Sequence, residues 1–223
     1  SHIVGYASDQ YGTAGIEQSY NQTLKGERNF ASWTDVLKSL AGSGVDGNDV
    51  TLTINSTIQQ AAQDALGGNV GACVVLDPET GAVLAMASSP TYDASQFGEL
   101  LQAAAEGNAE DDSAMLNRAT LALYAPGSTF KMVSLATALE DDVATPDTVY
   151  DAPGTMDIGN APVTNFDSTD YGQITLRRAT ELSSNTVFGQ LGVELGAERL
   201  VAGAEAFGFN DAIDFQLPLY TSL

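Results

Sequence analysis

Histidine and cysteine are almost absent from this chain of 223 residues, which contains one of each. His2 lies at the chain terminus, so we expect neither a Ser-His-Asp triad nor a His-ligated metal centre. Cys73 lies in an apolar run, where we interpret it as a small buried hydrophobic residue rather than a nucleophile. The sequence therefore predicts no metal and no cofactor. Covalent chemistry would have to use a serine that is activated by a lysine.

Basic residues are also scarce, with 8 lysines and arginines against 29 aspartates and glutamates and a formal net charge of −21. Binding to nucleic acid or to an anionic membrane requires lysine and arginine, so neither partner is expected. We interpret the acidic residues as a solvated surface. No apolar run is long enough to span a bilayer, and no signal-peptide pattern opens the chain.

The most informative segment of the chain runs from Pro126 to Lys131 and leads into an apolar helical pattern. Ser128 would lie in the first turn of a helix and Lys131 one turn later, with about 5–6 Å between their Cβ atoms. The partial positive charge of a helix N-terminus favours an oxyanion and a neutral lysine. Such a lysine could take the proton of the serine hydroxyl if its pKa is lowered. The S-x-x-K pattern alone is weak evidence, because it is also typical of a capping serine and an exposed lysine.

Hydrophobic patterning predicts a chain of mixed helices and strands. Ser56 is predicted to cap a helix that ends at residues 67–68, where two glycines follow each other. Two apolar runs, residues 70–77 and 82–88, are predicted to form a β-hairpin in which Gly81 has a positive φ. Further helical patterns occupy residues 17–24, 33–40, 96–105, 128–139, 176–181, 186–194 and 198–206.

Residues 124–131, Tyr-Ala-Pro-Gly-Ser-Thr-Phe-Lys, resemble the active-site motif of the penicillin-binding proteins, the transpeptidases that cross-link peptidoglycan. Residues 182–186, Leu-Ser-Ser-Asn-Thr, resemble the S-x-N motif of the same family. Residues 15–26 are similar to the segment before the catalytic domain in class B enzymes, the monofunctional D,D-transpeptidases. The resemblance covers nearly the whole chain and extends to residues 48–55, 74–88 and 117–119.

The resemblance implies an α+β fold, namely a partial penicillin-binding protein transpeptidase (β-lactamase-like) fold in which helices flank an antiparallel sheet. It implies that residues 1–47 are the end of an N-terminal non-catalytic region and a linker. Residues 48–223 are then the N-terminal part of the transpeptidase domain. Class B enzymes carry an N-terminal membrane anchor, so the resemblance implies an extracytoplasmic protein whose anchor precedes the given sequence.

The resemblance also implies a catalytic set of four residues. Ser128 would attack the stem peptide, Lys131 would accept its proton, Ser183 would relay a proton, and Asn185 would bind the lysine and the substrate amide. Expected partners are peptidoglycan stem peptides, β-lactam antibiotics and other proteins of cell-wall synthesis. From the residues alone, Ser183 and Asn185 could instead cap a helix that starts near Thr186.

The chain departs from the family in its third motif. No K-[ST]-G triplet is present, and Lys131 is the last lysine. The family carries this motif on a strand C-terminal of S-x-N, so we expect a truncated chain that lacks the C-terminal strands and has little or no activity. The inner strand of the hairpin would then be unpaired, which predicts strand-mediated self-association or an altered packing. Asn55 stands where an aspartate is usual.

Two other functions remain open from the sequence. One is a non-catalytic scaffold domain of cell-wall assembly that keeps the penicillin-binding fold without the third motif. The other, less favoured, is a β-lactamase, whose S-D-N triplet would need an aspartate at the position of Ser184.

Overall fold

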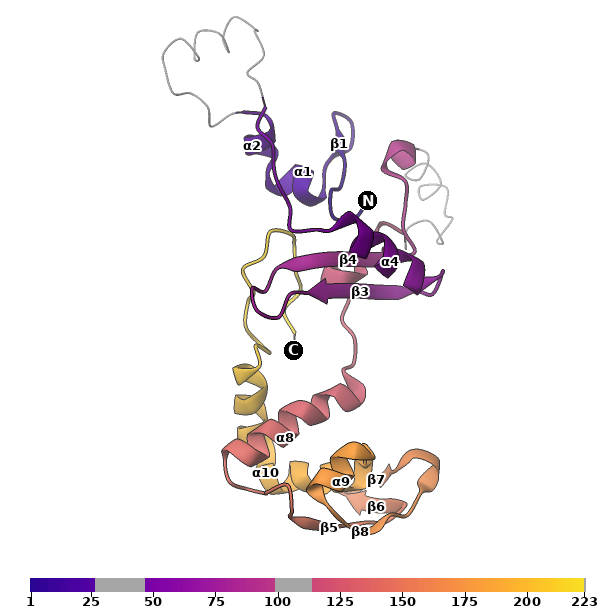
Figure 1. Ribbon diagram of the computed structural model, residues 1–223, viewed down its shortest axis with the longest axis vertical. Helices are drawn as coiled ribbons and strands as arrows, with labels where there is room; N and C mark the ends of the chain where they lie inside the picture. The colour runs from indigo at the N-terminus through magenta and orange to yellow at the C-terminus, as the bar shows by residue number, and fades with distance from the viewer. Residues whose placement is uncertain (27–46, 99–113, 223) are drawn as a thin grey trace, which may run out of the picture. The chain divides into compact units, whose positions relative to one another are not determined.

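The computed structural model describes residues 1–26, 47–98 and 114–222 (Figure 1). Its chain divides into two compact units, which are described separately here. Unit 1 consists of residues 1–123 and 214–220, and unit 2 consists of residues 124–213 and 221–223.

The N-terminal part of unit 1 is a short two-stranded ribbon followed by two short helices. The strands β1 (Ala7–Ser8) and β2 (Gly12–Thr13) pair antiparallel, and the helices α1 (Gly15–Ser19) and α2 (Asn21–Leu24) follow directly. Ile16 of α1 is buried in a cluster with Met86 and Leu217. Because these residues are far apart in the sequence, the cluster connects the ribbon region with the remainder of unit 1.

Helix α4 (Ser56–Leu66) confirms the predicted helix and corrects its predicted cap. The capping residue is Asn55, not Ser56, since the Asn55 side chain accepts hydrogen bonds from the backbone N–H groups of Thr57 and Ile58. Asparagine and aspartate are comparably good N-caps, which accounts for an asparagine at this position. The helix ends at Gly67 in the left-handed conformation (φ 54°), as the paired glycines predicted.

The predicted hairpin of unit 1 is present. Strand β3 (Gly71–Leu76) pairs antiparallel with β4 (Val83–Ser89), and Gly81 in the connecting turn has φ 72°. Helix α4 packs on this hairpin (Figure 1). The contact is a cluster of small side chains, Ala62, Ala85 and Ala87, and the partly buried Cys73 packs against the same cluster. The unit also contains the 3₁₀ turn η1 (Ala94–Gln96) and helix α7 (Arg118–Leu121).

Four helical elements of unit 2 correspond to predicted helices. The predicted helix at 128–139 is the 3₁₀ turn η2 (Gly127–Phe130) continued by α8 (Lys131–Glu140), and α9 (Leu176–Glu181) has the predicted bounds. The two predicted C-terminal helices form one element, α10 (Asn185–Ala206), interrupted at Gly196 (φ 74°). The predicted helix at 33–40 and most of that at 96–105 lie outside the described residues.

Four short strands of unit 2 were not predicted. They form two separate antiparallel pairs, β5 (Val149–Ala152) with β8 (Gly172–Thr175) and β6 (Thr155–Ile158) with β7 (Ala161–Thr164). The turn between β6 and β7 has two residues with positive φ, Gly159 (59°) and Asn160 (69°), which is the backbone of a type I′ hairpin. The 3₁₀ turn η3 (Phe166–Ser168) follows β7.

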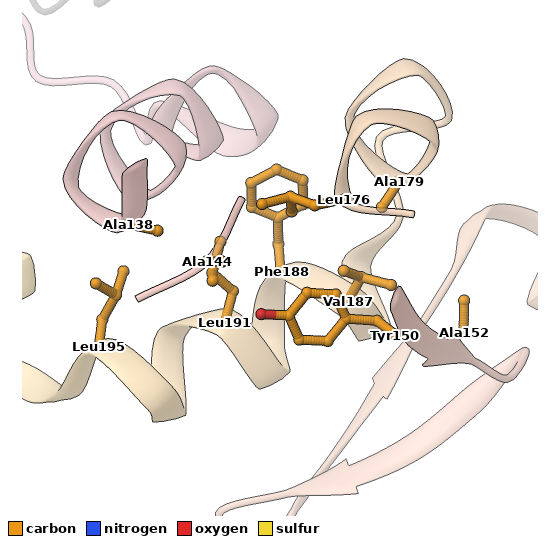
Figure 2. Packing of buried hydrophobic residues seen from close by; sticks show 10 residues of the cluster. All are labelled: Ala138, Ala144, Tyr150, Ala152, Leu176, Ala179, Val187, Phe188, Leu191 and Leu195. Carbon is orange, nitrogen blue, oxygen red and sulfur yellow. The ribbon is translucent and has the colours of Figure 1, made fainter. Parts of the chain in front are cut away.

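The core of unit 2 lies between its three helices and strand β5. Figure 2 shows side chains from α10, such as Phe188 and Leu191, facing Ala138 of α8 and Leu176 of α9. The Tyr150 hydroxyl donates a hydrogen bond to Glu194 (2.7 Å), and burial together with this carboxylate raises the tyrosine pKa. This cluster packs the C-terminal half of α8 against the first half of α10, and the members are Ala138, Ala144, Tyr150, Ala152, Leu176, Ala179, Val187, Phe188, Leu191 and Leu195.

Candidate active site

Ser128 lies on an exposed 3₁₀ turn directly before helix α8. Gly127 has φ 55°, and the carbonyl of Pro126 accepts hydrogen bonds from the backbone N–H and the hydroxyl of Thr129 (3.3 and 2.6 Å). The hydroxyl of Ser128 has no hydrogen-bond partner among the residues that the structure describes. The serine is therefore held by its backbone and is open to an incoming group.

Lys131 is the first residue of α8, and its ammonium group points to the turn before α10. Lys131 Nζ donates to the carbonyl oxygen of Ser183 (2.7 Å), to Ser183 Oγ (3.0 Å) and to Asn185 Oδ1 (2.6 Å). The Phe188 ring lies 5.5 Å from Nζ and provides an aromatic wall. The side chain is half-buried, and this burial lowers the pKa of Lys131 because the charged form loses hydration.

In the turn at residues 183–185, one side chain caps helix α10 and the other two contact Lys131. The side chain that caps α10 is Ser184, which accepts from the N–H of Val187 (3.4 Å). Ser183 and Asn185 do not cap the helix, so their side chains are available for Lys131. Ser183 has φ 53°, a left-handed conformation that is uncommon for residues with a Cβ atom and is typical of functional sites.

Asn185 connects the lysine to strand β7. While Asn185 Oδ1 accepts from the lysine, its Nδ2 donates to the carbonyl of Thr164 (2.7 Å). An amide held at both ends has only one orientation that satisfies both partners. The carbonyl of Thr164 therefore determines that Asn185 presents an oxygen, not an N–H, to the lysine.

Of the four predicted residues, the structure brings three into direct contact and places the fourth one turn away. Lys131, Ser183 and Asn185 share hydrogen bonds, whereas Ser128 is connected to Lys131 through the backbone, its carbonyl accepting from the lysine N–H. Catalytic hydrogen bonds are often long or poorly aligned before substrate binds, so this separation is compatible with proton transfer. A neutral Lys131 would offer a lone pair within one helical turn of the serine hydroxyl.

Two further residues at this site were not predicted from the sequence. Thr164 and Asn165 lie at the end of β7, a strand that was not predicted, and both contact the turn before α10. Their proximity to that turn depends on the register of the β6–β7 pair, which the Gly-Asn turn dipeptide at 159–160 could have indicated.

A search for other types of site gives nothing within the described ranges. No group of three or more His, Cys, Asp and Glu side chains there could hold a metal ion. Among the same residues, no helix combines the length and the apolar character that crossing a bilayer requires.

Comparison with known proteins relates this arrangement to a family. The family described as "Penicillin binding protein transpeptidase domain" matches residues 71–222, and "Penicillin binding protein A dimerisation domain" matches residues 1–50. The chain is 33% identical over 222 residues to the peptidoglycan D,D-transpeptidase PbpA of Mycolicibacterium smegmatis, covering 93% of this chain and 45% of that relative.

Solved structures agree with the sequence matches. The D,D-transpeptidase domain of a peptidoglycan glycosyltransferase from Eggerthella lenta is 60% identical with a TM-score of 0.87, and the match covers all of this chain and 48% of that one. Penicillin-binding protein A from M. tuberculosis, solved as an imipenem acyl-enzyme complex, is 32% identical with a TM-score of 0.86, covering 98% of this chain and 54% of that one.

The chain spans about half the length of the relatives it matches. These matches confirm the predicted α+β fold and the resemblance stated from the two sequence motifs. The relatives are named as D,D-transpeptidases, and one similar structure is an acyl-enzyme formed with a β-lactam. By its sequence and its fold, this chain belongs to the penicillin-binding protein transpeptidase family.

Proposed function

We propose that this chain is part of a peptidoglycan D,D-transpeptidase that cross-links stem peptides through an acyl-enzyme on Ser128. The observation that carries the proposal is the half-buried Lys131, one turn after Ser128, with its Nζ held by Ser183 and Asn185. The named activity of the relatives supports the same reaction class. β-Lactams would acylate the same serine, which agrees with the similar M. tuberculosis protein being solved as an imipenem acyl-enzyme complex.

In the proposed reaction, Ser128 Oγ forms a bond to the carbonyl carbon between the two terminal D-alanines of a stem peptide. The C–N bond breaks, and the terminal D-alanine leaves. The Ser128 proton passes to neutral Lys131, and Ser183 Oγ relays a proton to the leaving amine. An amine of a second stem peptide then takes the acyl group and restores the serine.

The polar groups around the lysine have separate roles in this proposal. Burial lowers the pKa of Lys131 and so increases the neutral fraction that can act as base. Asn185 holds the lysine and would also bind the substrate amide. The backbone N–H of Ser128 would provide half of the oxyanion hole, where the loss of one donor typically reduces the rate by about 10²–10³-fold.

The proposed activity concerns the protein as a whole, and we propose that these 223 residues alone react slowly or not at all. No K-[ST]-G triplet occurs among them. Among the described residues of unit 1, strand β3 pairs only with β4, and its Val74 and Leu76 are exposed. We therefore also propose that the chain can self-associate through β3, which a concentration-dependent mass in light scattering would test.

An extracytoplasmic location follows from the proposed substrate, because peptidoglycan lies outside the cell membrane. The same proposal includes an N-terminal membrane anchor, a domain boundary near residue 47, and other cell-wall synthesis proteins as partners. These points depend on the family resemblance and not on the described residues.

The test is intact-mass spectrometry after incubation with a penicillin, on this chain, on a C-terminally extended chain that includes a K-[ST]-G strand, and on Ser128→Ala. Ser56→Ala is the matched control, since Ser56 is also an exposed serine in a first helical turn. The proposal predicts one adduct on the extended chain, which persists in Ser56→Ala and disappears in Ser128→Ala. No adduct on either chain would favour a non-catalytic scaffold instead.

A further inference from the structure

Asn165 is a buried asparagine whose amide makes five hydrogen bonds. Its side chain is 3% exposed and lies just after strand β7. Its Oδ1 accepts from Ser184 Oγ (3.0 Å), from the N–H of Thr186 (3.1 Å) and from Thr186 Oγ1 (3.3 Å). Its Nδ2 donates to the carbonyls of Pro153 (3.0 Å) and Thr169 (3.1 Å). Both the oxygen and the nitrogen of this amide are therefore satisfied within the fold.

These bonds connect the strand region to the turn that holds the lysine. Ser184 and Thr186, which are 1% and 0% exposed, alternate in the sequence with Ser183 and Asn185. The buried pair faces Asn165, and the other pair faces Lys131. The preceding residue, Thr164, uses its carbonyl to orient the Asn185 amide. Thr164 and Asn165 thus hold both the buried side chains of the turn and the Asn185 amide that faces Lys131.

The chemistry of a buried amide makes this arrangement specific. A buried donor or acceptor without a partner is destabilising, so an amide with all its partners has one stable orientation. Reversing the Asn165 amide would point its NH₂ group at the N–H of Thr186 and its oxygen at two carbonyls. The turn is therefore held in one register against β7.

We propose that Asn165 is a positioning residue for acyl transfer, which fixes Ser184 and Thr186 so that Ser183 and Asn185 face Lys131. The inference rests on the proposed function. Asn165 touches none of the reacting groups and acts through the turn. Displacing a catalytic group by about 1 Å can reduce a rate by about 10²-fold, so a loosened turn is expected to slow acylation strongly.

The first test measures penicillin acylation rates of the C-terminally extended chain in a double-mutant cycle of Asn165→Ala and Asn185→Ala. Asn165→Ala is expected to slow acylation by about 10-fold or more. In the Asn185→Ala background, the loss caused by Asn165→Ala is expected to be smaller by about threefold or more. The reason is that Asn165 acts partly through the Asn185 side chain, which this background already lacks. A role in stability alone would give the same loss in both backgrounds.

Asn117→Ala is the matched control. Asn117 is likewise a buried asparagine, and its side chain caps α7 in unit 1 by accepting from the N–H of Ala119. This variant is expected to lower the melting temperature without coupling to Asn185→Ala. Should Asn165→Ala not fold, Thr186→Val carries the cycle, since it keeps the shape of the side chain and removes one Asn165 contact.

A second readout on this chain is independent of catalysis. The chain has three lysines, so ¹³C-labelled lysine gives three side-chain signals, and Lys131→Arg assigns that of Lys131. The inference predicts that Asn165→Ala, or Thr186→Val if that variant alone folds, shifts the Lys131 signal and leaves that of Lys25 unchanged. An unchanged Lys131 signal, or additive acylation losses, would overturn it. Failure of the unmutated extended chain to acylate would instead refute the proposed function.

Discussion

The two sides of the candidate site are built differently. On the lysine side, Lys131 Nζ has three acceptors, and the turn that supplies them is tied to strand β7 through Thr164 and Asn165. On the serine side, Ser128 is exposed on a 3₁₀ turn, and the side-chain contacts of this turn come from Thr129, on the Pro126 carbonyl, and from Phe130, whose ring meets Phe209 edge to face. Unit 2 therefore holds the base in a preformed environment and leaves the nucleophile accessible.

A serine nucleophile requires a base and groups that stabilise the oxyanion, and the difference means that these two come from different parts of the protein. The surroundings of the base are formed by α8, α10 and β7, all within unit 2, and burial there lowers the pKa of Lys131. Apart from the backbone N–H of Ser128 itself, the groups that stabilise the developing oxyanion must face Ser128 from its open side. Substitutions on the lysine side should therefore change proton transfer, and substitutions near the serine should change local stability of the turn.

The largest expected effect comes from Lys131→Met, which keeps a long apolar stem and removes the base. We expect the penicillin acylation rate of the extended chain to fall by about 10²–10⁴-fold, the usual contribution of a general base. Quenched intact-mass measurements would follow the rate. A loss below about threefold would mean that another group deprotonates Ser128 and that the preformed lysine side has a different purpose.

A smaller loss is expected for Asn185→Ala, which removes an acceptor of the Lys131 ammonium and the donor to Thr164. A hydrogen bond to a charged group contributes about 1.5–3 kcal/mol, equivalent to about 10- to 100-fold in rate. The variant Asn185→Asp, which keeps an acceptor for the lysine, should raise the lysine pKa because it adds a negative charge. Equal pH–rate profiles for the two variants would contradict the role given to Asn185.

Gly203→Ala tests the packing of α10 on α8, the two helices that carry Asn185 and Lys131. An added Cβ would lie 1.9 Å from Thr137 Oγ1, and Thr137 is buried and β-branched, so its side chain has little freedom to move. We expect a loss of about 1–3 kcal/mol in the free energy of unfolding, measured by urea denaturation.

The matched control is Gly189→Ala on the same helix. Its added Cβ would lie 2.5 Å from Ile158 Cδ1, the flexible end of a partly exposed side chain, so the loss should be smaller. A larger loss for Gly189→Ala than for Gly203→Ala would show that the α8–α10 contact is not the constraint described here.

The smallest effect is expected on the serine side. Thr129→Val removes the hydroxyl that donates to the Pro126 carbonyl at an exposed position. One such hydrogen bond contributes about 0.5–1.5 kcal/mol, and water can replace it here, so acylation should change by less than about 10-fold. A loss as large as that of Asn185→Ala would show that the serine turn is as tightly specified as the lysine side.

The sequence predicted the elements with strong apolar patterning and the residues within recognisable motifs. The hairpin β3–β4 follows from two apolar runs around a turn with Gly81, and helix α9 from a short pattern that begins at Leu176. The structure placed Lys131, Ser183 and Asn185 together, although their catalytic roles remain proposals.

The strands β5–β8 were not predicted, because each has only four residues and several of these residues are polar. Such strands are specified mainly by their partners and by turns such as Gly159-Asn160. Asn165 was missed for the same reason. Its role depends on five hydrogen bonds to four residues at irregular sequence separations, and no local pattern encodes them.

The most direct test of the account is a ¹³C NMR titration of the Lys131 side chain in this chain, with Lys131→Arg for assignment. An ordinary lysine has a pKa of about 10.4. Because burial disfavours the ammonium form, the account predicts a lower value for Lys131, and an acylation rate of the extended chain that rises with pH up to that value. A Lys131 pKa at or above 10.4 would contradict the claim that this fold prepares the lysine as a base.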